Sequence, residues 1–231
     1  MSTLKKKALI IGGTRGIGKS IVKELKKKFI VYYTGTKINK KKNFFQLDLS
    51  KQSSVNNFLK DISKIKPDIL VNNAGINNIK YFHTYKSEEI KEMLNVNLIN
   101  FTIITKNLLK HMMKKKWGRI INISSIWGVN PCKKRSIYSL TKSSVISFSK
   151  SLAIEYGKYN INTNSISPGF IMTDLTKKSL SSIQLRSLKK KVPLQRLGSS
   201  EEIAEIVMFL CSDKNYINGT NIVADGGFLS G

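Results

Sequence analysis

Short apolar runs alternate along the chain with longer stretches in which apolar residues recur every three or four positions. Seven of the short runs end in Gly, Asn, Ser or Asp and are typical of buried strands. They are KALIIGG (7–13), FIVYYTG (29–35), NFFQLDLS (43–50), DILVNNAG (68–75), GRIINISS (118–125), NTNSISPG (162–169) and TNIVADGG (220–227). We expect each of them to form one strand of a sheet.

The stretches between these strands have the period of amphipathic helices. They cover residues 19–28, 55–62, 87–116, 138–158 and 201–212. Alternating strands and helices predict an α/β fold: a doubly wound, Rossmann-type parallel sheet with helices on both faces. No linker, internal repeat or low-complexity segment divides the chain, so we expect one domain over residues 1–231.

The composition agrees with a globular protein, since 41% of the 231 residues are apolar. No apolar stretch approaches the ~20 residues of a membrane span. The apolar run ALII near the start is too short for a signal peptide. Cys132 and Cys211 lie far apart and form no metal-binding spacing. We therefore expect reduced thiols and a cytoplasmic location, or the plastid stroma if the source is eukaryotic.

The charge is unusual, because 40 Lys and Arg residues face 14 Asp and Glu residues, which gives +26. Such a charge would attract nucleic acid. Only five of the 40 cations are arginine, however, and arginine is the residue best suited to read base edges. Many lysines and asparagines are typical of an AT-rich coding sequence. We favour compositional bias over nucleic-acid binding, and attraction to an acidic partner stays open.

The first predicted strand runs directly into the glycine-rich segment GGTRGIG (12–18), and a helix follows it. Glycines let the backbone approach a diphosphate, and a helix N-terminus offers free N–H groups. A glycine cluster alone is a weak signal, but its place between first strand and first helix favours a dinucleotide site.

The end of the second strand carries no acid of the kind that binds the ribose 2′-hydroxyl of NAD. The only acid between residues 12 and 48 is Glu24, well inside the first predicted helix. Arg15 and Lys37 are placed instead to meet a 2′-phosphate, although Lys37 taken alone is one more of many lysines. We therefore expect NADP(H).

Ser124 and Ser125 end a predicted strand, Tyr138 follows thirteen residues after Ser125, and Lys142 comes four residues later. Positions i and i+4 of a helix share a face. A nearby ammonium lowers the pKa of a phenol, so Tyr138 would exchange a proton with a substrate oxygen that Ser125 hydrogen-bonds. Tyr-x-x-x-Lys alone occurs by chance in many helices. Its occurrence together with the glycine loop, NNAG (72–75) and the serine indicates an active site.

Several segments match one known family: GGTRGIG (12–18), the LDL around Asp48, NNAG (72–75), Asn97 in NVNL, Ser125, YSLTK (138–142), SPGFIMTDL (167–175) and DGG (225–227). On these residues the chain resembles the short-chain dehydrogenase/reductase family over essentially its whole length. The resemblance implies a seven-stranded sheet, and a homotetramer or homodimer in which the helix over 87–116 pairs with a neighbour's helix.

The resemblance also implies roles for individual residues. Asn97, Ser125, Tyr138 and Lys142 would be the catalytic residues, with Asn97 kinking its helix and holding a water of a proton relay to Lys142. Asp48 would contact the adenine. The expected cofactor-binding residues are Gly12, Thr14, Arg15, Gly16, Ile17, Gly18, Thr36, Lys37, Asp48, Leu49, Asn73, Ala74, Gly75, Tyr138, Lys142, Pro168, Gly169, Ile171 and Thr173.

The C-terminal segments 192–213 and 216–227 are most similar to the 3-oxoacyl-acyl-carrier-protein reductases of fatty acid biosynthesis. We therefore expect an NADP(H)-dependent oxidoreductase that reduces a 3-oxoacyl thioester, either free or bound to acyl carrier protein. Two features depart from that group: the stretch between Thr34 and Asp48 is short for a second helix, and Trp127 stands where a small residue is expected. The alternatives are reduction of a keto-sugar or other anionic metabolite, or a non-catalytic nucleotide-sensing or nucleic-acid-binding protein.

Trp127, Arg135 and Phe170 are expected to contact the substrate, and residues 174–191 fall where the family has a mobile lid. The cations at 133–135 and in 174–191 are expected to surround the entrance, where they would attract an anionic substrate or carrier. A solvated surface is the alternative for the same cations.

Lys116 falls where the resemblance places a cation for docking the carrier, and Tyr159 occupies the second such position. His83 and His111 are the only histidines, and neither has a His, Cys or acid at ligand spacing. We expect no metal site.

Overall fold

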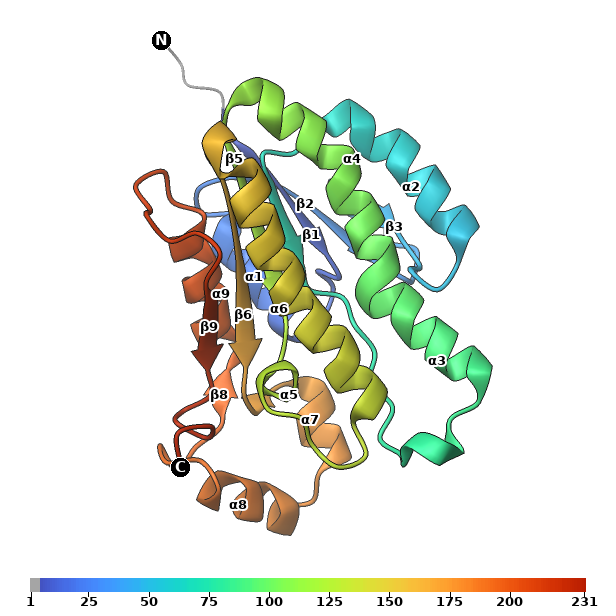
Figure 1. The fold of residues 1–231 in the computed structure, drawn as a ribbon, viewed down its shortest axis with the longest axis vertical. Helices are drawn as coiled ribbons and strands as arrows, with labels where there is room; N and C mark the ends of the chain where they lie inside the picture. Colours follow the sequence, from blue (N-terminus) through green and yellow to red (C-terminus); the bar gives the residue numbers. More distant parts are fainter. Residues whose placement is uncertain (1–4) are drawn as a thin grey trace.

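The computed structural model describes residues 5–231 and places all seven expected strands in one parallel sheet (Figure 1). The strand order is β3-β2-β1-β4-β5-β6-β9, with the order reversing between β1 and β4 as in a doubly wound fold. The strands are β1 (Lys7–Ile11), β2 (Ile30–Gly35), β3 (Phe44–Gln46), β4 (Ile69–Asn72), β5 (Gly118–Ile123), β6 (Ile161–Pro168) and β9 (Asn221–Ala224). The prediction of a parallel α/β sheet is confirmed.

Helices cover both faces of this sheet, as expected from the alternating pattern. The long ones are α1 (Gly16–Leu25), α2 (Gln52–Ile65), α4 (Asn100–Lys115), α6 (Ser136–Tyr156) and α9 (Ser200–Leu210). Strand β1 shows how the two cores are divided. Ala8 and Ile10 pack in the core with α1 and α9, whereas Leu9 and Ile11 pack in the core with α2, α4 and α6.

The single helix predicted over 87–116 is divided in the structure. It consists of α3 (Ser87–Leu94), a π-helical turn η2 (Asn95–Ile99) and α4. Asn97 lies in the π turn with its side chain buried, accepting the Ile76 N–H at 2.8 Å and donating to the Ile76 carbonyl at 2.9 Å. These bonds tie the turn to the loop after β4, in agreement with the expected disturbance of the helix at Asn97.

Residues 36–43 form no helix, so the expected shortening between β2 and β3 is confirmed. The segment 174–191 folds into two short helices, α7 (Asp174–Ser179) and α8 (Ser182–Lys190). Next to it, a parallel ladder that the apolar pattern did not predict joins β7 (Ile171–Met172) to β8 (Gly198–Ser199). Strands of two residues carry too few side chains to show a period.

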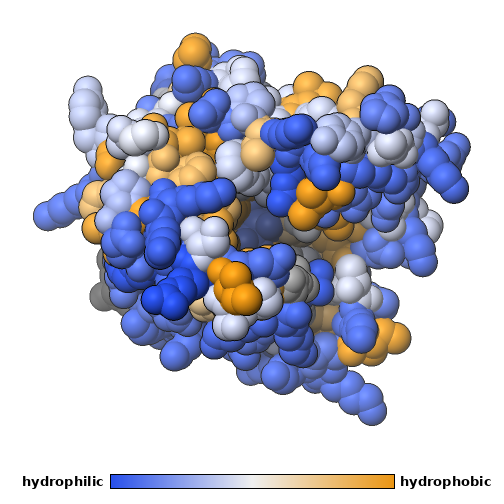
Figure 2. Space-filling model, turned by 90° about the horizontal axis from the view of Figure 1, so that it is seen from below, coloured by the Kyte–Doolittle hydropathy of each residue, from blue (hydrophilic) through white to orange (hydrophobic). Residues whose placement is uncertain are grey.

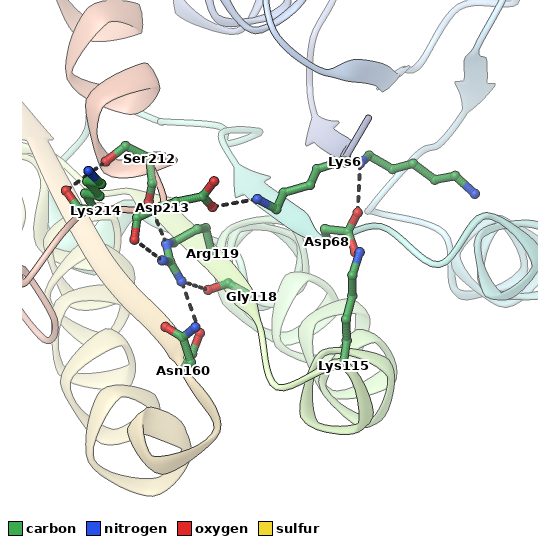
Figure 3. A network of polar contacts seen from close by, with 10 residues as sticks. Lys6, Asp68, Lys115, Gly118, Arg119, Asn160, Ser212, Asp213 and Lys214 are labelled. Carbon is green, nitrogen blue, oxygen red and sulfur yellow. Dashed lines mark hydrogen bonds and ion pairs between the residues drawn. The ribbon is translucent and has the colours of Figure 1, made fainter. Parts of the chain in front are cut away.

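A buried arginine joins several segments at the amino end of the sheet (Figure 3). The Arg119 side chain, at the start of β5, is 1% exposed and stacks over Trp117 at 4.5 Å from the ring centre. Its guanidinium donates to four backbone carbonyls, those of Gly118 (2.8 Å), Asn160 (3.0 Å), Ser212 (3.2 Å) and Asp213 (3.4 Å). Lys6 pairs with the Asp213 carboxylate at 2.5 Å. This network holds the residues after α9 against the sheet.

A second polar cluster at the same end of the sheet surrounds the buried Asp68. Its carboxylate pairs with Lys115, accepts the Lys7 backbone N–H at 2.9 Å and lies 3.5 Å from His111 Nε2. The fold thus gives His111 an acidic neighbour that sequence spacing did not indicate. Within residues 5–231 no helix is long and apolar enough to cross a membrane.

Candidate active site

The expected functional residues gather at the carboxyl ends of β1, β4, β5 and β6, where a doubly wound sheet binds its ligands. Figure 2 views the molecule from this end and shows a hollow near the middle of the surface, surrounded mainly by hydrophilic side chains with a few apolar patches.

The glycine loop between β1 and α1 has backbone geometry that larger residues would not tolerate. Gly12 has a φ of +83°, and a Cβ there would lie 2.9 Å from Ala74. A Cβ on Gly18 would lie 2.0 Å from the Gly12 carbonyl oxygen. The Asn73 side chain donates to that same oxygen at 2.8 Å. The loop is therefore closed against the NNAG segment after β4, and the first turn of α1 carries no acid that would repel a diphosphate.

The end of β2 lies beside this loop. Gly12 N–H donates to the Thr34 hydroxyl at 2.9 Å, and a Cβ on Gly35 would collide with Thr14. Arg15, which caps the start of α1, is exposed, as are Thr36 and Lys37. No acid occupies residues 36–47. The two cations expected to meet a 2′-phosphate thus occur on adjoining loops without a competing carboxylate in either.

Asp48 and Leu49 have different surroundings. The Asp48 Oδ1 accepts the Ser50 hydroxyl at 2.6 Å and the Ser50 N–H at 3.0 Å, and these bonds hold the pKa of the carboxyl below its usual range. Leu49 is a core residue, packed with α2 and α4, and its carbonyl accepts the Asn100 amide at 2.7 Å. The side chain of Leu49 is therefore not available to a cofactor, and the expected contact would have to come from its backbone.

Gly75 brings the cofactor loop and the expected catalytic residues together. A Cβ at Gly75 would lie 3.3 Å from Asn97 Oδ1 and 3.5 Å from Lys142 Nζ. Asn97 Nδ2 also donates to the Thr141 hydroxyl at 3.2 Å. Asn97 and Lys142, 45 positions apart in the sequence, thus face one point beside the NNAG segment.

Ser125, Tyr138 and Lys142 meet where β5 ends against α6. Ser125 caps the short helix α5 (Ile126–Val129), accepting the Trp127 N–H at 3.2 Å. The Lys142 Nζ lies 5.7 Å from the centre of the Tyr138 ring and donates to the Ile123 carbonyl at 2.8 Å. The predicted convergence of these side chains from two elements occurs in the structure.

Burial dominates the electrostatics of this group. It raises the pKa of the Tyr138 phenol, against a lowering by the Ser125 hydrogen bond and by the charge of Arg135. It also lowers the pKa of the Lys142 ammonium to about 8. This differs from our expectation that Lys142 lowers the phenol pKa. The reason is that Lys142 loses its own charge before a buried phenol can ionise.

Two of the three expected substrate contacts belong to an aromatic cluster. Trp127 lies 6.0 Å from Phe170 and 5.8 Å from Phe228 between ring centres, and Phe170 lies 5.0 Å from Phe228, all edge to face. The cluster lies beside Ser125. The sequence did not indicate Phe228 as a member of this cluster, because it stands far from Trp127 and Phe170 in the chain and lies just outside DGG (225–227).

The segment after β6 supplies the remaining cofactor positions. Pro168 is buried at the end of β6, and Gly169 N–H donates to the Ala224 carbonyl at 2.9 Å. Ile171 is 9% exposed, so most of its side chain is covered. Thr173 caps α7, and a Cβ on Gly16 would lie 3.5 Å from its methyl group. Thr173 therefore lies against the glycine loop.

The cations divide between the two ends of the sheet. Arg135 caps α6 three residues before Tyr138, at the site, with Lys133 and Lys134 on the loop before it. Lys116, by contrast, precedes β5, and Tyr159 precedes β6. Both therefore lie at the amino end of the parallel sheet, away from the site of the same chain. This placement does not support docking of a carrier by Lys116 at its own chain's entrance.

No cluster of three or more His, Cys, Asp or Glu side chains suited to a metal ion occurs among residues 5–231. His83 stacks on Tyr81 with ring centres 6.0 Å apart. His111 belongs to the Asp68 cluster at the other end of the sheet.

A doubly wound parallel sheet with a glycine loop after its first strand defines the class of dinucleotide-binding proteins. The sequence model of a family described as enoyl-(acyl carrier protein) reductase matches residues 12–229. The 3-oxoacyl-[acyl-carrier-protein] reductase FabG of Aquifex aeolicus (strain VF5) is 38% identical over 97% of each chain. Carbonyl reductase family member 4 of Xenopus laevis is 36% identical over 97% of this chain and 98% of its own.

Solved structures of similar proteins show the same fold over nearly the whole chain. ElxO with NADP bound is 34% identical, with a TM-score of 0.90 over 99% of this chain and 100% of its own. 4-Hydroxyisoleucine dehydrogenase complexed with NADH is 32% identical, with a TM-score of 0.91 over 98% of this chain and 99% of its own. The chain belongs to the short-chain dehydrogenase/reductase family, and it is an NAD(P)-dependent oxidoreductase of that family.

Proposed function

We propose that this chain reduces a 3-oxoacyl thioester to the 3-hydroxy form with NADPH. The observation that carries the proposal is the convergence of four side chains beside the glycine loop: Asn97, Ser125, Tyr138 and Lys142. Curated relatives of nearly the same length, named 3-oxoacyl-[acyl-carrier-protein] reductases, support the choice of substrate.

A nicotinamide cofactor bound between the glycine loop and Thr173 would supply a hydride. The Tyr138 hydroxyl would give its proton to the substrate's ketone oxygen, and Ser125 would hydrogen-bond that oxygen as charge develops on it. Lys142 would replace the proton on Tyr138 and hold the ribose. Asn97, bonded to Ile76 and Thr141, would keep the path to Lys142 ordered.

NADPH is proposed over NADH from the residues around the end of β2. Arg15 and Lys37 are exposed cations on adjoining loops, and an acid for the 2′-hydroxyl is absent from residues 36–47. An arginine and a lysine both bind phosphate well. The site residues fit a 2′-phosphate better than a free hydroxyl.

The loop before α6 supports an anionic substrate or carrier, since Lys133, Lys134 and Arg135 are consecutive there. The same cations would also suit a keto-sugar nucleotide. For the assembly we propose a homotetramer or homodimer in which the segment from α3 to α4 pairs with the same segment of a neighbour, where Ile99 is an exposed apolar side chain. Light scattering after size exclusion would show a mass at twice or four times that of the chain, and a monomeric mass would reject this assembly.

The substrate is tested with a panel. Purified protein would be given NADPH or NADH with acetoacetyl-coenzyme A, a longer 3-oxoacyl thioester, a keto-sugar nucleotide or an uncharged ketone. We expect the highest kcat/KM with a 3-oxoacyl thioester and NADPH. Faster reduction of the keto-sugar nucleotide would reject the thioester assignment, and equal use of NADH would reject the cofactor preference.

A further inference from the structure

Arg135 has a fixed position one turn before Tyr138. It is the N-cap residue of α6, where its carbonyl accepts the Ser139 N–H at 2.7 Å. Its own N–H donates to the Cys132 carbonyl at 3.1 Å. The preceding residue is held as well, because the Lys80 N–H donates to the Lys134 carbonyl at 3.2 Å. The backbone that carries the Arg135 side chain is therefore held within its own loop, by the first turn of α6 and by the segment at Lys80.

The guanidinium of Arg135 differs from the neighbouring lysines in its surroundings. Its Nη1 is buried and makes no hydrogen bond to any residue in the described part of the chain, 5–231. Lys133 and Lys134 are exposed and lie 5.7 Å and 4.8 Å from the centre of the Tyr81 ring. Of these three consecutive cations, Arg135 is the one whose charge acts on the Tyr138 phenol.

The charge also acts on a second phenol, that of Tyr85, whose hydroxyl donates to the Asn78 carbonyl at 2.6 Å. Burial and Glu89 raise the pKa of Tyr85, and Lys80 and, less strongly, Arg135 oppose that rise. Glu89, which pairs with Lys80 at 2.6 Å, is the acid near Tyr85. Within residues 5–231 no ion pair joins Glu89 or another carboxylate to Arg135. The positive charge of its guanidinium is therefore not offset by a paired carboxylate near the two phenols.

The groups that face Tyr138 come from three elements. Ser125, after β5, hydrogen-bonds the phenol; Lys142, on α6, lies over its ring; and Arg135, at the start of α6, adds its charge. Asn97, from η2, bonds Thr141 instead. No carboxylate acts on the phenol among the described residues. Tyr138 is thus surrounded by one neutral donor and two cations.

The two cations behave differently as pH rises. Burial lowers the pKa of Lys142 to about 8, so this ammonium gives up its proton while a buried phenol still holds its own. A guanidinium has a pKa above about 12 and stays charged over the whole range in which an enzyme works. Without ligand, Arg135 is the permanent positive charge near the tyrosine.

We propose that Arg135 is a positioning residue for Tyr138: its permanent charge stabilises the phenolate that remains after the tyrosine has given up its proton. The proposal rests on the proposed role of Tyr138 as the acid in reduction. It assigns to Arg135 part of the work that sequence reasoning assigned to Lys142 alone. A nearby positive charge lowers the pKa of a phenol, and because Arg135 is half-buried we expect a change of about one unit.

The test uses the full chain with neutral and charged replacements. Arg135→Gln and Arg135→Met remove the charge, Arg135→Lys retains it, and Lys60→Gln removes an exposed charge from α2, away from the site. For each variant, kcat/KM for acetoacetyl-coenzyme A with NADPH would be measured against pH. Reduction requires the protonated phenol, so kcat/KM falls as pH rises through the phenol pKa. We expect this fall to move upward by about one pH unit in the two neutral variants.

The Arg135→Lys variant should stay near the wild-type profile, and Lys60→Gln should superimpose on it. A fall at the same pH in wild type, Arg135→Gln and Arg135→Met would overturn the proposal, as would an equal displacement in Lys60→Gln. A merely structural role would lower the rate without moving the profile. Thermal unfolding would identify folded variants.

A second readout separates this inference from the proposed function. Tyrosine labelled with ¹³C at Cζ, with the Tyr138 signal assigned from Tyr138→Phe, reports ionisation of the phenol by NMR without substrate. We expect the Tyr138 signal to titrate at higher pH in Arg135→Gln than in wild type. An unchanged titration overturns the role of Arg135 whatever the substrate is, whereas absence of thioester reduction by wild type rejects only the proposed function.

Discussion

Tyr138 and Lys142 lie one turn apart on α6, and Lys142 is only 4% exposed. Their spacing was readable from the sequence, because residues four apart share a helix face. The direction of their pKa changes was not, because burial depends on what packs around the pair. Phe228 is a similar case: its place beside Trp127 follows from the path of the chain after β9. Single residues are predictable where a local motif defines them.

The proposed preference for NADPH depends on two residues, Arg15 and Lys37. Replacing both Arg15 and Lys37 by alanine removes two charged donors, each worth about 1.5–3 kcal/mol when bonded to phosphate. Together the two losses amount to about 3–6 kcal/mol, so we expect KM for NADPH to rise by roughly a hundredfold or more while KM for NADH changes little. Lys60→Ala, which removes an exposed charge from α2, is the control. Equal losses for both cofactors would contradict the assignment of these cations to a 2′-phosphate.

At the scale of elements, the apolar runs identified all seven strands of the main sheet because buried parallel strands are nearly continuous in apolar residues. The helical period likewise identified α1, α2, α6 and α9 with ends shifted by a few residues, but it predicted one helix where the structure has α3, η2 and α4. The π turn η2 could not be read from periodicity, since its cause is a bond between Asn97 and a distant loop. The segment of the short helices α7 and α8 is expected to be a lid, and the apolar pattern predicts no helix in it.

The interruption of the α3–α4 helix should depend on one side chain. Asn97→Ala leaves the Ile76 N–H and carbonyl without their partners, and each buried unpaired group costs about 1–3 kcal/mol. We expect urea denaturation to show a free energy of unfolding that is lower by about 1–3 kcal/mol or more, and we expect a lower kcat. Asn95→Ala, in the same turn, is the matched control. Equal stability of the two variants would show that the Asn97 bonds do not hold this turn.

At the scale of the whole molecule, two apolar cores lie on the two faces of the sheet, and Arg119 joins the chain segments at its amino end. The sequence predicted both covered faces, since strands and helices alternate. It did not indicate the Arg119 network, because the four carbonyls that it binds come from three separate segments of the chain. The sequence also did not indicate that Lys116 lies at the amino end of the sheet, away from the site.

Arg119→Met should be strongly destabilising. Methionine fills much of the same space but donates no hydrogen bond, so buried carbonyls at Gly118, Asn160 and Ser212 lose their donor. We expect the free energy of unfolding to fall by about 2–5 kcal/mol, measured with urea. Arg186→Met, on the exposed surface of α8, should change it by less than about 0.5 kcal/mol. A similar effect of both changes would reject the role of the network.

The net charge of +26 predicts two opposite effects of salt. Salt screens repulsion between the cations, so stability against urea should rise with ionic strength. It also screens attraction of anions, so kcat/KM for acetoacetyl-coenzyme A should fall. An uncharged ketone is the control, and its kcat/KM should remain nearly constant. Equal salt dependence for the charged and uncharged substrates would contradict electrostatic attraction at the entrance.

The central claim is that Tyr138 exchanges the proton in an NADPH-dependent reduction, and the most direct measurement compares wild type with Tyr138→Phe. The change removes one hydroxyl from a largely buried ring. The rate of NADPH oxidation with acetoacetyl-coenzyme A should fall by roughly 10²–10⁴-fold, while NADPH binding, followed by fluorescence, stays close to wild type. A Tyr138→Phe variant that binds NADPH and keeps wild-type turnover would contradict the claim.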